Sequence, residues 1–145
     1  MTYYRASELG ALAGSLTASA ARSELSTLSK SATGSFDVFL SHSYLDAVAV
    51  LGLKRLLEDE GLTVYVDWIE DKDLDRSRVS ASTAARLRNR ARSCTSLVYA
   101  TSRNASKSRW MPWELGYFDG VHGPERVSIC PIENGASGAS IGEEY

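Results

Sequence analysis

Cysteine is scarce in this sequence, which has only two, Cys94 and Cys130. They lie far apart, each within an apolar run, and so indicate buried free thiols rather than the disulfide framework of a small secreted protein. The sequence also lacks an apolar run near the roughly 18 residues of a membrane helix, and its first residues lack the basic start and apolar core of a signal peptide. These absences predict a cytoplasmic protein with no membrane segment.

Neither sign of charge is in large excess. The chain has 16 basic and 18 acidic residues, a formal net charge of −2 and an isoelectric point near 5.7. A protein that binds nucleic acid or anionic lipid through its overall charge carries a positive excess. We therefore expect no nucleic-acid partner, and we expect any phosphate-binding site to be local.

The short motifs of most metal and nucleotide enzymes are missing. There is no GxGxxG, P-loop, HExxH or CxxC, and two histidines far apart in the chain give no zinc ligand set. The stretch 71–76 resembles a calcium loop, but Arg76 stands where the turn needs glycine and Ser82 where a bidentate glutamate belongs. GASIG at 138–142 matches a nucleophile-elbow pattern, yet no strand precedes it and no histidine follows. We expect neither a metal nor a cofactor.

Strand-like and helix-like segments alternate from Phe36 onward. Short apolar runs predict buried strands at 36–41, 62–68, 94–102 and 126–132. Apolar residues at helical spacing predict helices over 46–60, over about 80–92, and from Ser108 to about Gly120. Alternation with short connections predicts an α/β fold in which helices cover both faces of a parallel sheet.

Residues 1–34 have a different composition, rich in alanine, serine and threonine, with leucines at roughly helical intervals. They predict a weakly amphipathic helix, followed by a flexible linker over Ser29 to Ser35. The chain therefore divides into a leader, 1–34, and a domain, 35–145. The leader helix either packs on the domain, is partly disordered, or serves in docking or oligomerisation.

Polar residues follow the predicted strands, and in a parallel sheet these strand ends form the ligand site. We expect six side chains to converge at that edge: Ser41, His42, Ser43, Asp67, Ser102 and Glu114. Glu114 stands out because it is a lone acid within the most aromatic segment of the chain, SRWMPWELGYFDG.

Three segments, FDVFLSHSYLD, GLTVYVDWIE and SRWMPWELG, together resemble the Toll/interleukin-1 receptor (TIR) domain, particularly its bacterial branch. The resemblance covers Phe36 to about Ile132. It implies a flavodoxin-like three-layer fold with a five-stranded parallel sheet. Only four strands are visible, and the residues after Ile132 are too few for a further helix and strand. We therefore expect the fifth strand to be missing or cut off.

The resemblance implies two classes of function. Some TIR domains cleave the nicotinamide–ribose bond of NAD⁺, with a glutamate where Glu114 stands, and others only assemble with further TIR proteins. By position, the family's nucleotide pocket carries over to Ser41, His42, Tyr44 and Asp67.

One carboxylate suffices for this cleavage. Glycosidases need a second because the departing alkoxide must be protonated, whereas nicotinamide leaves as a neutral ring. A single anion can hold the ribose hydroxyls and stabilise positive charge on the ribose. Trp110 and Trp113 offer faces on which a base or pyridinium stacks, worth about 1 kcal/mol or more per contact. Ser41, His42 and Ser43 can donate hydrogen bonds to phosphate or ribose oxygens.

Each of these residues also has a structural interpretation. Glu114 would lie in the first turn of a helix, where capping and the helix dipole favour a carboxylate. Trp110 and Trp113 would close the core or an interface. His42 would be a hydrogen-bonded loop histidine, and Asp67 would cap the following turn.

The sequence thus predicts an NAD⁺ glycohydrolase or cyclase in bacterial immune or antiphage signalling. NAD⁺ would be its substrate, and linear, cyclic or transferred ADP-ribose its product. The alternatives are a non-enzymatic module that recruits another TIR protein and a relative that acts on another N-glycoside. The second predicted helix carries a basic stretch, which follows an acidic loop at 70–75. Its arginines are Arg86, Arg88, Arg90 and Arg92. This segregation suggests head-to-tail self-association as a hypothesis, although a solvated surface is the simpler explanation.

Overall fold

The computed structural model describes residues 4–68, 81–105, 108 and 110–133. The acidic loop, with its rejected calcium pattern, and GASIG at 138–142 lie outside these residues. The elements in chain order are β1 (Tyr4–Arg5), α1 (Ala6–Leu12), α2 (Ala18–Ser31), β2 (Phe36–Ser41), a 3₁₀ turn (Tyr44–Asp46), α3 (Ala47–Asp59), β3 (Val64–Val66), α4 (Ala81–Arg92), β4 (Cys94–Thr101), α5 (Trp110–His122), a second 3₁₀ turn (Pro124–Arg126) and β5 (Val127–Glu133).

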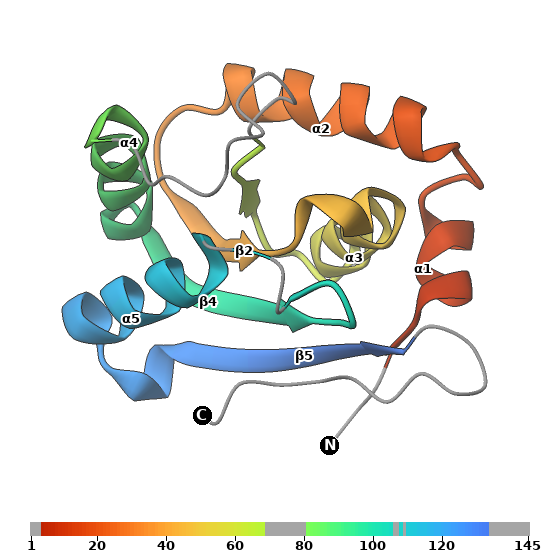
Figure 1. The fold of residues 1–145 in the computed structure, drawn as a ribbon. Coiled ribbons are helices and arrows are strands. Elements are labelled where there is room, and N and C mark those ends of the chain that lie inside the picture. The colour runs from red at the N-terminus through yellow and green to blue at the C-terminus, as the bar shows by residue number, and fades with distance from the viewer. Residues whose placement is uncertain (1–3, 69–80, 106–107, 109, 134–145) are drawn as a thin grey trace.

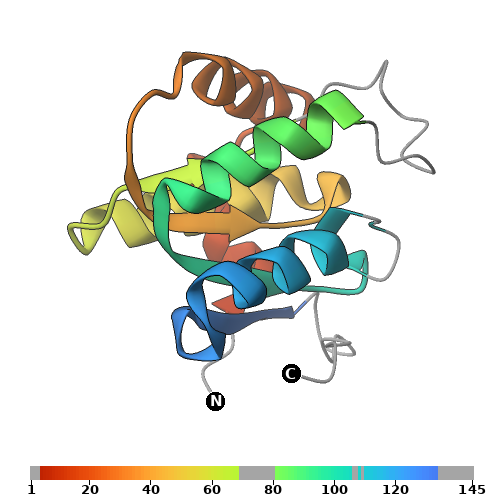
Figure 2. The same cartoon turned by 90° about the vertical axis from the view of Figure 1, so that its left-hand side faces the viewer.

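All five strands form one parallel sheet in the order β1-β5-β4-β2-β3 (Figure 1). Helices cover both of its faces. α1 and α3 pack on one face, where Val38 and Leu40 belong to a buried cluster with Leu9. α4 and α5 lie together on the other face (Figure 2), where Phe39 and Leu87 belong to a second cluster. Consecutive residues of β2 therefore point to opposite faces, as the pleat of a strand requires.

The fifth strand corrects the sequence prediction. The predicted flavodoxin-like α/β fold is confirmed, but its last strand is not missing, because β1 pairs in parallel with β5 through Tyr4 opposite Ile132 and Arg5 opposite Glu133. The N-terminal strand thus occupies the place that a strand after β5 would take in a flavodoxin-like sheet. With only two residues, β1 is too short to show the alternation by which a strand is recognised in a sequence.

The N-terminal helices pack into the same core. Leu9 of α1 and Leu25 of α2 are fully buried in the cluster on the α3 side of the sheet. Arg55 of α3 joins both helices, donating to the Leu12 carbonyl at 3.2 Å and to both carboxylate oxygens of Glu24 at 3.1 Å. α2 continues to Ser31, so the first three residues of the predicted linker are helical. The segment 4–31 therefore supplies an edge strand and two helices of this body.

The other elements agree closely with the sequence prediction. β2 has the predicted bounds, and the predicted inward residues of α4, Ala84, Leu87 and Ala91, are buried. α3 ends before Gly61, whose φ of 89° lies in the left-handed region that favours glycine. Ser108 Oγ accepts from the Met111 N–H at 3.2 Å and so caps α5, as expected.

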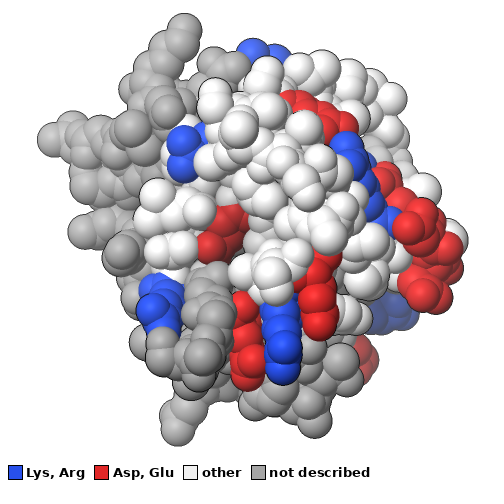
Figure 3. Space-filling view, turned by 90° about the vertical axis from the view of Figure 1, so that its right-hand side faces the viewer, with Lys and Arg blue, Asp and Glu red and all other residues white. Residues whose placement is uncertain are grey.

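Acidic and basic side chains are interspersed on the side of the molecule that carries α1 (Figure 3). Two pairs of opposite charge are Arg55 with Glu24 and Lys54 with Glu58. Within the described part of the chain, no helix is both long enough and apolar enough to cross a membrane.

The closest approach between α1 and α3 generates a stability prediction. A Cβ added to Gly52 would lie 1.9 Å from the Leu9 carbonyl oxygen, so any larger residue must push the two helices apart. We expect Gly52→Ala to lower the free energy of unfolding by about 3 kcal/mol, measured by urea denaturation. The matched control is Gly116→Ala in α5, where a Cβ meets nothing within 4 Å. It should stabilise by about 0.5 to 1 kcal/mol. Equal effects of the two changes would refute the close approach.

Candidate active site

Glu114 is buried at the carboxyl edge of the sheet. Its residue is 9% exposed, and Ser41, the last residue of β2, donates a 2.6 Å hydrogen bond to its Oε1. A carboxylate is rarely buried unless its oxygens are hydrogen-bonded, because burial removes its hydration. The contact joins β2, an interior strand of the sheet, to α5. It thereby fixes a carboxyl group at the edge where ligands bind in this class of fold.

The position of Glu114 in α5 argues against the explanation that it only stabilises the start of the helix. α5 begins at Trp110, and its first turn contains no acidic residue. Glu114 follows that turn, and the stabilisation of a carboxylate by the helix dipole falls off within the first turn. Capping and dipole therefore do not explain why an acid stands at this position.

Aromatic rings surround the acid on α5. Trp110 is buried at the start of the helix rather than lying in the preceding loop, and it meets Trp113 edge to face at 5.7 Å between ring centroids. Trp113 is half-buried and stacks on Tyr117 at 5.3 Å. Trp113, Glu114 and Tyr117 also line a narrow gap between α4 and α5 that has no room for water. The wall behind the carboxylate is thus apolar and dry, which strengthens electrostatic interactions at Glu114.

Asp67 lies on the same side of the sheet as Ser41. Its side chain is 3% exposed; Tyr65 donates to Oδ1 at 2.5 Å and Arg86 of α4 binds Oδ2 at 3.2 Å. Burial, and then the negative charge of Asp67, raise the pKa of the Tyr65 hydroxyl well above its ordinary value. Asp67 therefore ties the end of β3 to α4.

His42 and Tyr44 lie on the opposite side of the sheet from Glu114. Both rings stack on Trp68, with centroids 5.1 Å and 5.0 Å away, and Arg22 of α2 lies 4.7 Å over the Tyr44 ring. The two nitrogens of His42 contact the carbonyl oxygens of Asp67 at 3.1 Å and Ser43 at 3.2 Å. This stack joins the ends of β2 and β3.

Two further predicted residues are engaged in local structure. Ser43 is buried, and its hydroxyl accepts from the Leu45 N–H at 3.3 Å as the cap of a 3₁₀ turn. Ser102 donates to Asp46, which also accepts from the Asn104 side chain at 2.7 Å. This second cluster fastens the end of β4 to the start of α3.

The structure thus divides the predicted site residues. It brings Ser41, Glu114 and Asp67 to the α4 and α5 side of the sheet, and it places His42 and Tyr44 on the α3 side. Sequence reasoning missed Trp68 as the center of the aromatic stack and Asp46 as the partner of Ser102. Asp46 was recognisable as the acid that opens a helix, but its partner comes from a distant strand end. The described residues contain no cluster of three metal-binding side chains.

The pairing of Tyr65 with Asp67 generates the second prediction. Tyr65→Phe removes a donor to a buried carboxylate and should lower the free energy of unfolding by about 2 kcal/mol near pH 7. Because the folded-state pKa lies above the ordinary value near 10, the neutral phenol stabilises the fold below pH 10 and this contribution is lost as pH rises further. The difference between wild type and variant should therefore shrink above about pH 10 in urea denaturation series.

Tyr117→Phe is the matched control. The buried Tyr117 hydroxyl has no hydrogen-bond partner among the described residues, so its removal should cost no stability. If Tyr65→Phe were equally harmless, the bond to Asp67 would contribute nothing.

Comparison with known proteins supports one family. No protein-family model matches the chain. The chain is 55% identical over 111 residues to a Bacillus cereus (strain MSX-D12) protein named "Probable 3' cyclic ADP-D-ribose synthase ThsB'", covering 76% of this chain and 56% of that protein. It is 32% identical over 83 residues to the Cytobacillus dafuensis protein named "Putative cyclic ADP-D-ribose synthase TIR2", covering 57% of this chain and 22% of that protein. The chain thus spans 56% of the length of the first relative and 22% of the second. It is a homologue of bacterial TIR-domain proteins, which confirms the family that its three sequence segments predict.

Proposed function

We propose that this chain cleaves the nicotinamide–ribose bond of NAD⁺ and that Glu114 is the carboxylate on which the reaction depends. The observation that carries the proposal is the burial of Glu114 at the carboxyl edge of the sheet, in a hydrogen bond with Ser41. Burial removes the hydration of a carboxyl group, which costs free energy, and acids held in this way at a ligand-binding edge often have a functional role.

The chemistry fits a single fixed anion. The bond between the anomeric carbon and the pyridinium nitrogen breaks with both electrons going to nitrogen, and nicotinamide leaves neutral. Positive charge then develops on the ribose, where a nearby carboxylate stabilises it and accepts hydrogen bonds from the ribose hydroxyls. Since Glu114 is already held by Ser41 against an apolar wall, little reorganisation is needed as the charge develops.

The names of the two relatives favour cyclisation as the second step. A cyclic ADP-ribose forms when a nucleophilic atom elsewhere in the same ADP-ribose bonds to the anomeric carbon and loses its proton. Water in its place gives linear ADP-ribose. We therefore propose a cyclase activity, with hydrolysis as the outcome when water reaches the ribose first. A role in bacterial antiphage signalling follows from the family resemblance.

Self-association stays a prediction. Two of the four arginines of α4 are engaged within the fold, since Arg86 binds Asp67 and Arg90 donates to the Ala32 carbonyl at 2.7 Å while lying over the Tyr65 ring. Arg88, which is half-buried, and the exposed Arg92 are therefore the better positions at which to test an α4 interface.

The third prediction concerns Glu114 itself. Glu114→Gln and Glu114→Ala should both abolish nicotinamide release from NAD⁺, followed by chromatography at high protein concentration. Asp119→Asn is the control, because Asp119 is a carboxylate on the same helix, toward the end remote from the site, and its loss should leave the rate unchanged. Release that persists in folded Glu114 variants would remove this residue from the mechanism. No release by the wild type would favour the interaction module.

The fourth prediction concerns the group that holds Glu114. Ser41→Ala removes a hydrogen bond to a charged acceptor, which is worth about 1.5 to 3 kcal/mol. If the bond positions the carboxylate for the transition state, kcat should fall by roughly tenfold to a hundredfold with a smaller change in KM. Ser41→Thr keeps the hydroxyl and should restore part of the rate. A change confined to KM would show that Ser41 contacts the substrate instead.

A further inference from the structure

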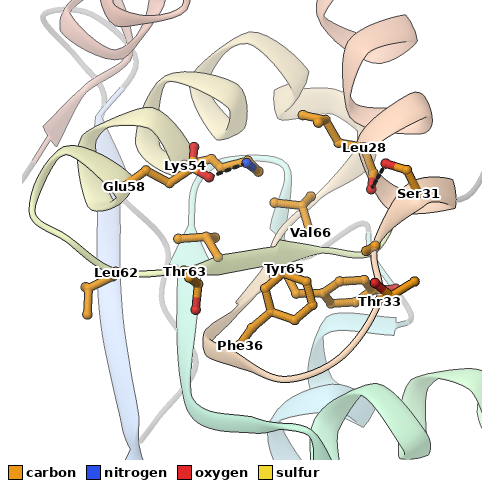
Figure 4. A pocket seen from close by; sticks show the side chains of 12 residues that line it. Leu28, Ser31, Thr33, Phe36, Lys54, Glu58, Leu62, Thr63, Tyr65 and Val66 are labelled. Carbon is orange, nitrogen blue, oxygen red and sulfur yellow. Dashed lines mark hydrogen bonds and ion pairs between the residues drawn. The ribbon is translucent and has the colours of Figure 1, made fainter.

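A groove of about 420 Å³ lies along the free edge of β3 (Figure 4). It is bounded by the end of α2, the last turns of α3 and the residues that lead into β2 and β3. Phe36 and Thr63, at the amino ends of these strands, line it. Ser41 and Glu114 lie at the opposite, carboxyl end of the sheet. The groove is therefore distinct from the proposed active site.

Backbone groups of β3 face this groove. The Thr63 carbonyl accepts from the Val38 N–H at 3.0 Å, so Thr63 faces β2, and by the alternation of a parallel strand Tyr65 does as well. Val64 and Val66 must then direct their N–H and C=O groups to the other side. Both residues line the groove. No other strand pairs with that edge in the described part of the chain.

These outward backbone groups are not freely solvated. Val64 is 4% exposed and Val66 is 3% exposed, so their polar groups lie at the bottom of a recess. Buried backbone donors and acceptors are nearly always paired in folded proteins. Just beyond them, the Trp68 N–H is paired, because it donates to Ser29 Oγ of α2 at 3.1 Å. α2 thus closes one end of the edge and leaves the stretch of the two valines open.

Side chains around the recess suit an extended peptide. Lys54 is 8% exposed and binds Glu58 through one contact of 2.7 Å, which leaves further N–H donors of its ammonium beside the groove (Figure 4). The rings of Phe36 and Tyr65 lie on the other side of the strand, 5.6 Å apart. Leu62, which is 38% exposed, adds an apolar rim. A strand laid here would place successive side chains alternately toward the ion pair and toward the rings.

We propose that this groove binds an extended segment of a partner protein, which adds as a short strand to the edge of β3. Alternating donors and acceptors along one line are complementary to a peptide backbone, and strand addition is an established mode of recognition. The recess specifies the occupant further. The sheet edge of a second folded copy is too wide for a recess between α2 and α3 whose floor residues, Val64 and Val66, are 4% and 3% exposed, whereas a single extended chain is narrower. Because Ser29 closes one end, the paired stretch is limited to a few residues.

The fifth prediction tests this site with a defined probe. We would titrate the ¹⁵N-labelled chain with a blocked pentapeptide of alternating threonine and valine and follow the amide resonances. The amides of Val64 and Val66 should shift saturably and become protected from solvent exchange, while the Tyr65 amide, already bonded to β2, should change less. A peptide with prolines in place of the valines lacks the donors and should not bind. The active site plays no part in this readout, so the test is independent of the proposed function.

Two variants make the test decisive. Val64→Pro removes an N–H that faces away from β2, a change that an edge strand tolerates, and should weaken peptide binding by about tenfold. Leu62→Lys places a charge on the rim and should also weaken it, whereas Leu45→Lys, at an exposed leucine outside the groove, should not. Absence of any response at Val64 and Val66 up to millimolar peptide would overturn the proposal. The proposal would also be overturned if the proline peptide bound as tightly as the threonine–valine peptide. The same holds if Val64→Pro and Leu62→Lys bound the peptide as tightly as the wild type.

Discussion

A hydrogen bond between the serine that ends β2 and a glutamate buried on α5 organises the proposed active site. The Ser41 hydroxyl holds Glu114 at 2.6 Å, and an apolar wall between α4 and α5 excludes water behind it. Everything proposed for the chemistry depends on this anion being fixed before the substrate arrives. The sheet sets the position of Ser41, and the Ser108 cap sets the start of the helix that carries Glu114.

The sheet that supports this site is completed from an unexpected part of the chain. β1 occupies the edge beside β5, and α1 and α2 then return across the molecule to the start of β2. Close contact at Gly52 and the two contacts of Arg55 hold these helices to α3. The same return path brings the end of α2 against β3, where it closes part of that strand's free edge and bounds the groove. Sheet completion and the proposed peptide site thus have one structural origin.

Local patterns in the sequence predicted most of the fold. The strands from Phe36 onward are continuous apolar runs, and α3 ends at a glycine, so short-range rules located them. β1 escaped notice because a strand of two residues owes its existence to pairing with β5 rather than to its own sequence. The sequence singled out Glu114 because an acid among aromatics is unusual. Its hydrogen bond to Ser41 joins residues far apart in the chain, and no local pattern reveals such a contact.

The division of the predicted site residues has a similar cause. Ser41 and His42 are adjacent, yet they lie on opposite sides of the sheet. Ser41 ends β2 and meets Glu114, whereas His42, one residue beyond the strand, stacks on Trp68. A crystal structure of the chain with an NAD⁺ analogue whose ribose ring oxygen is replaced by a methylene group would test the central claim most directly. Our account predicts that the ribose bearing nicotinamide lies within hydrogen-bond distance of the Glu114 carboxylate. An analogue bound with that ribose away from Glu114 would contradict it.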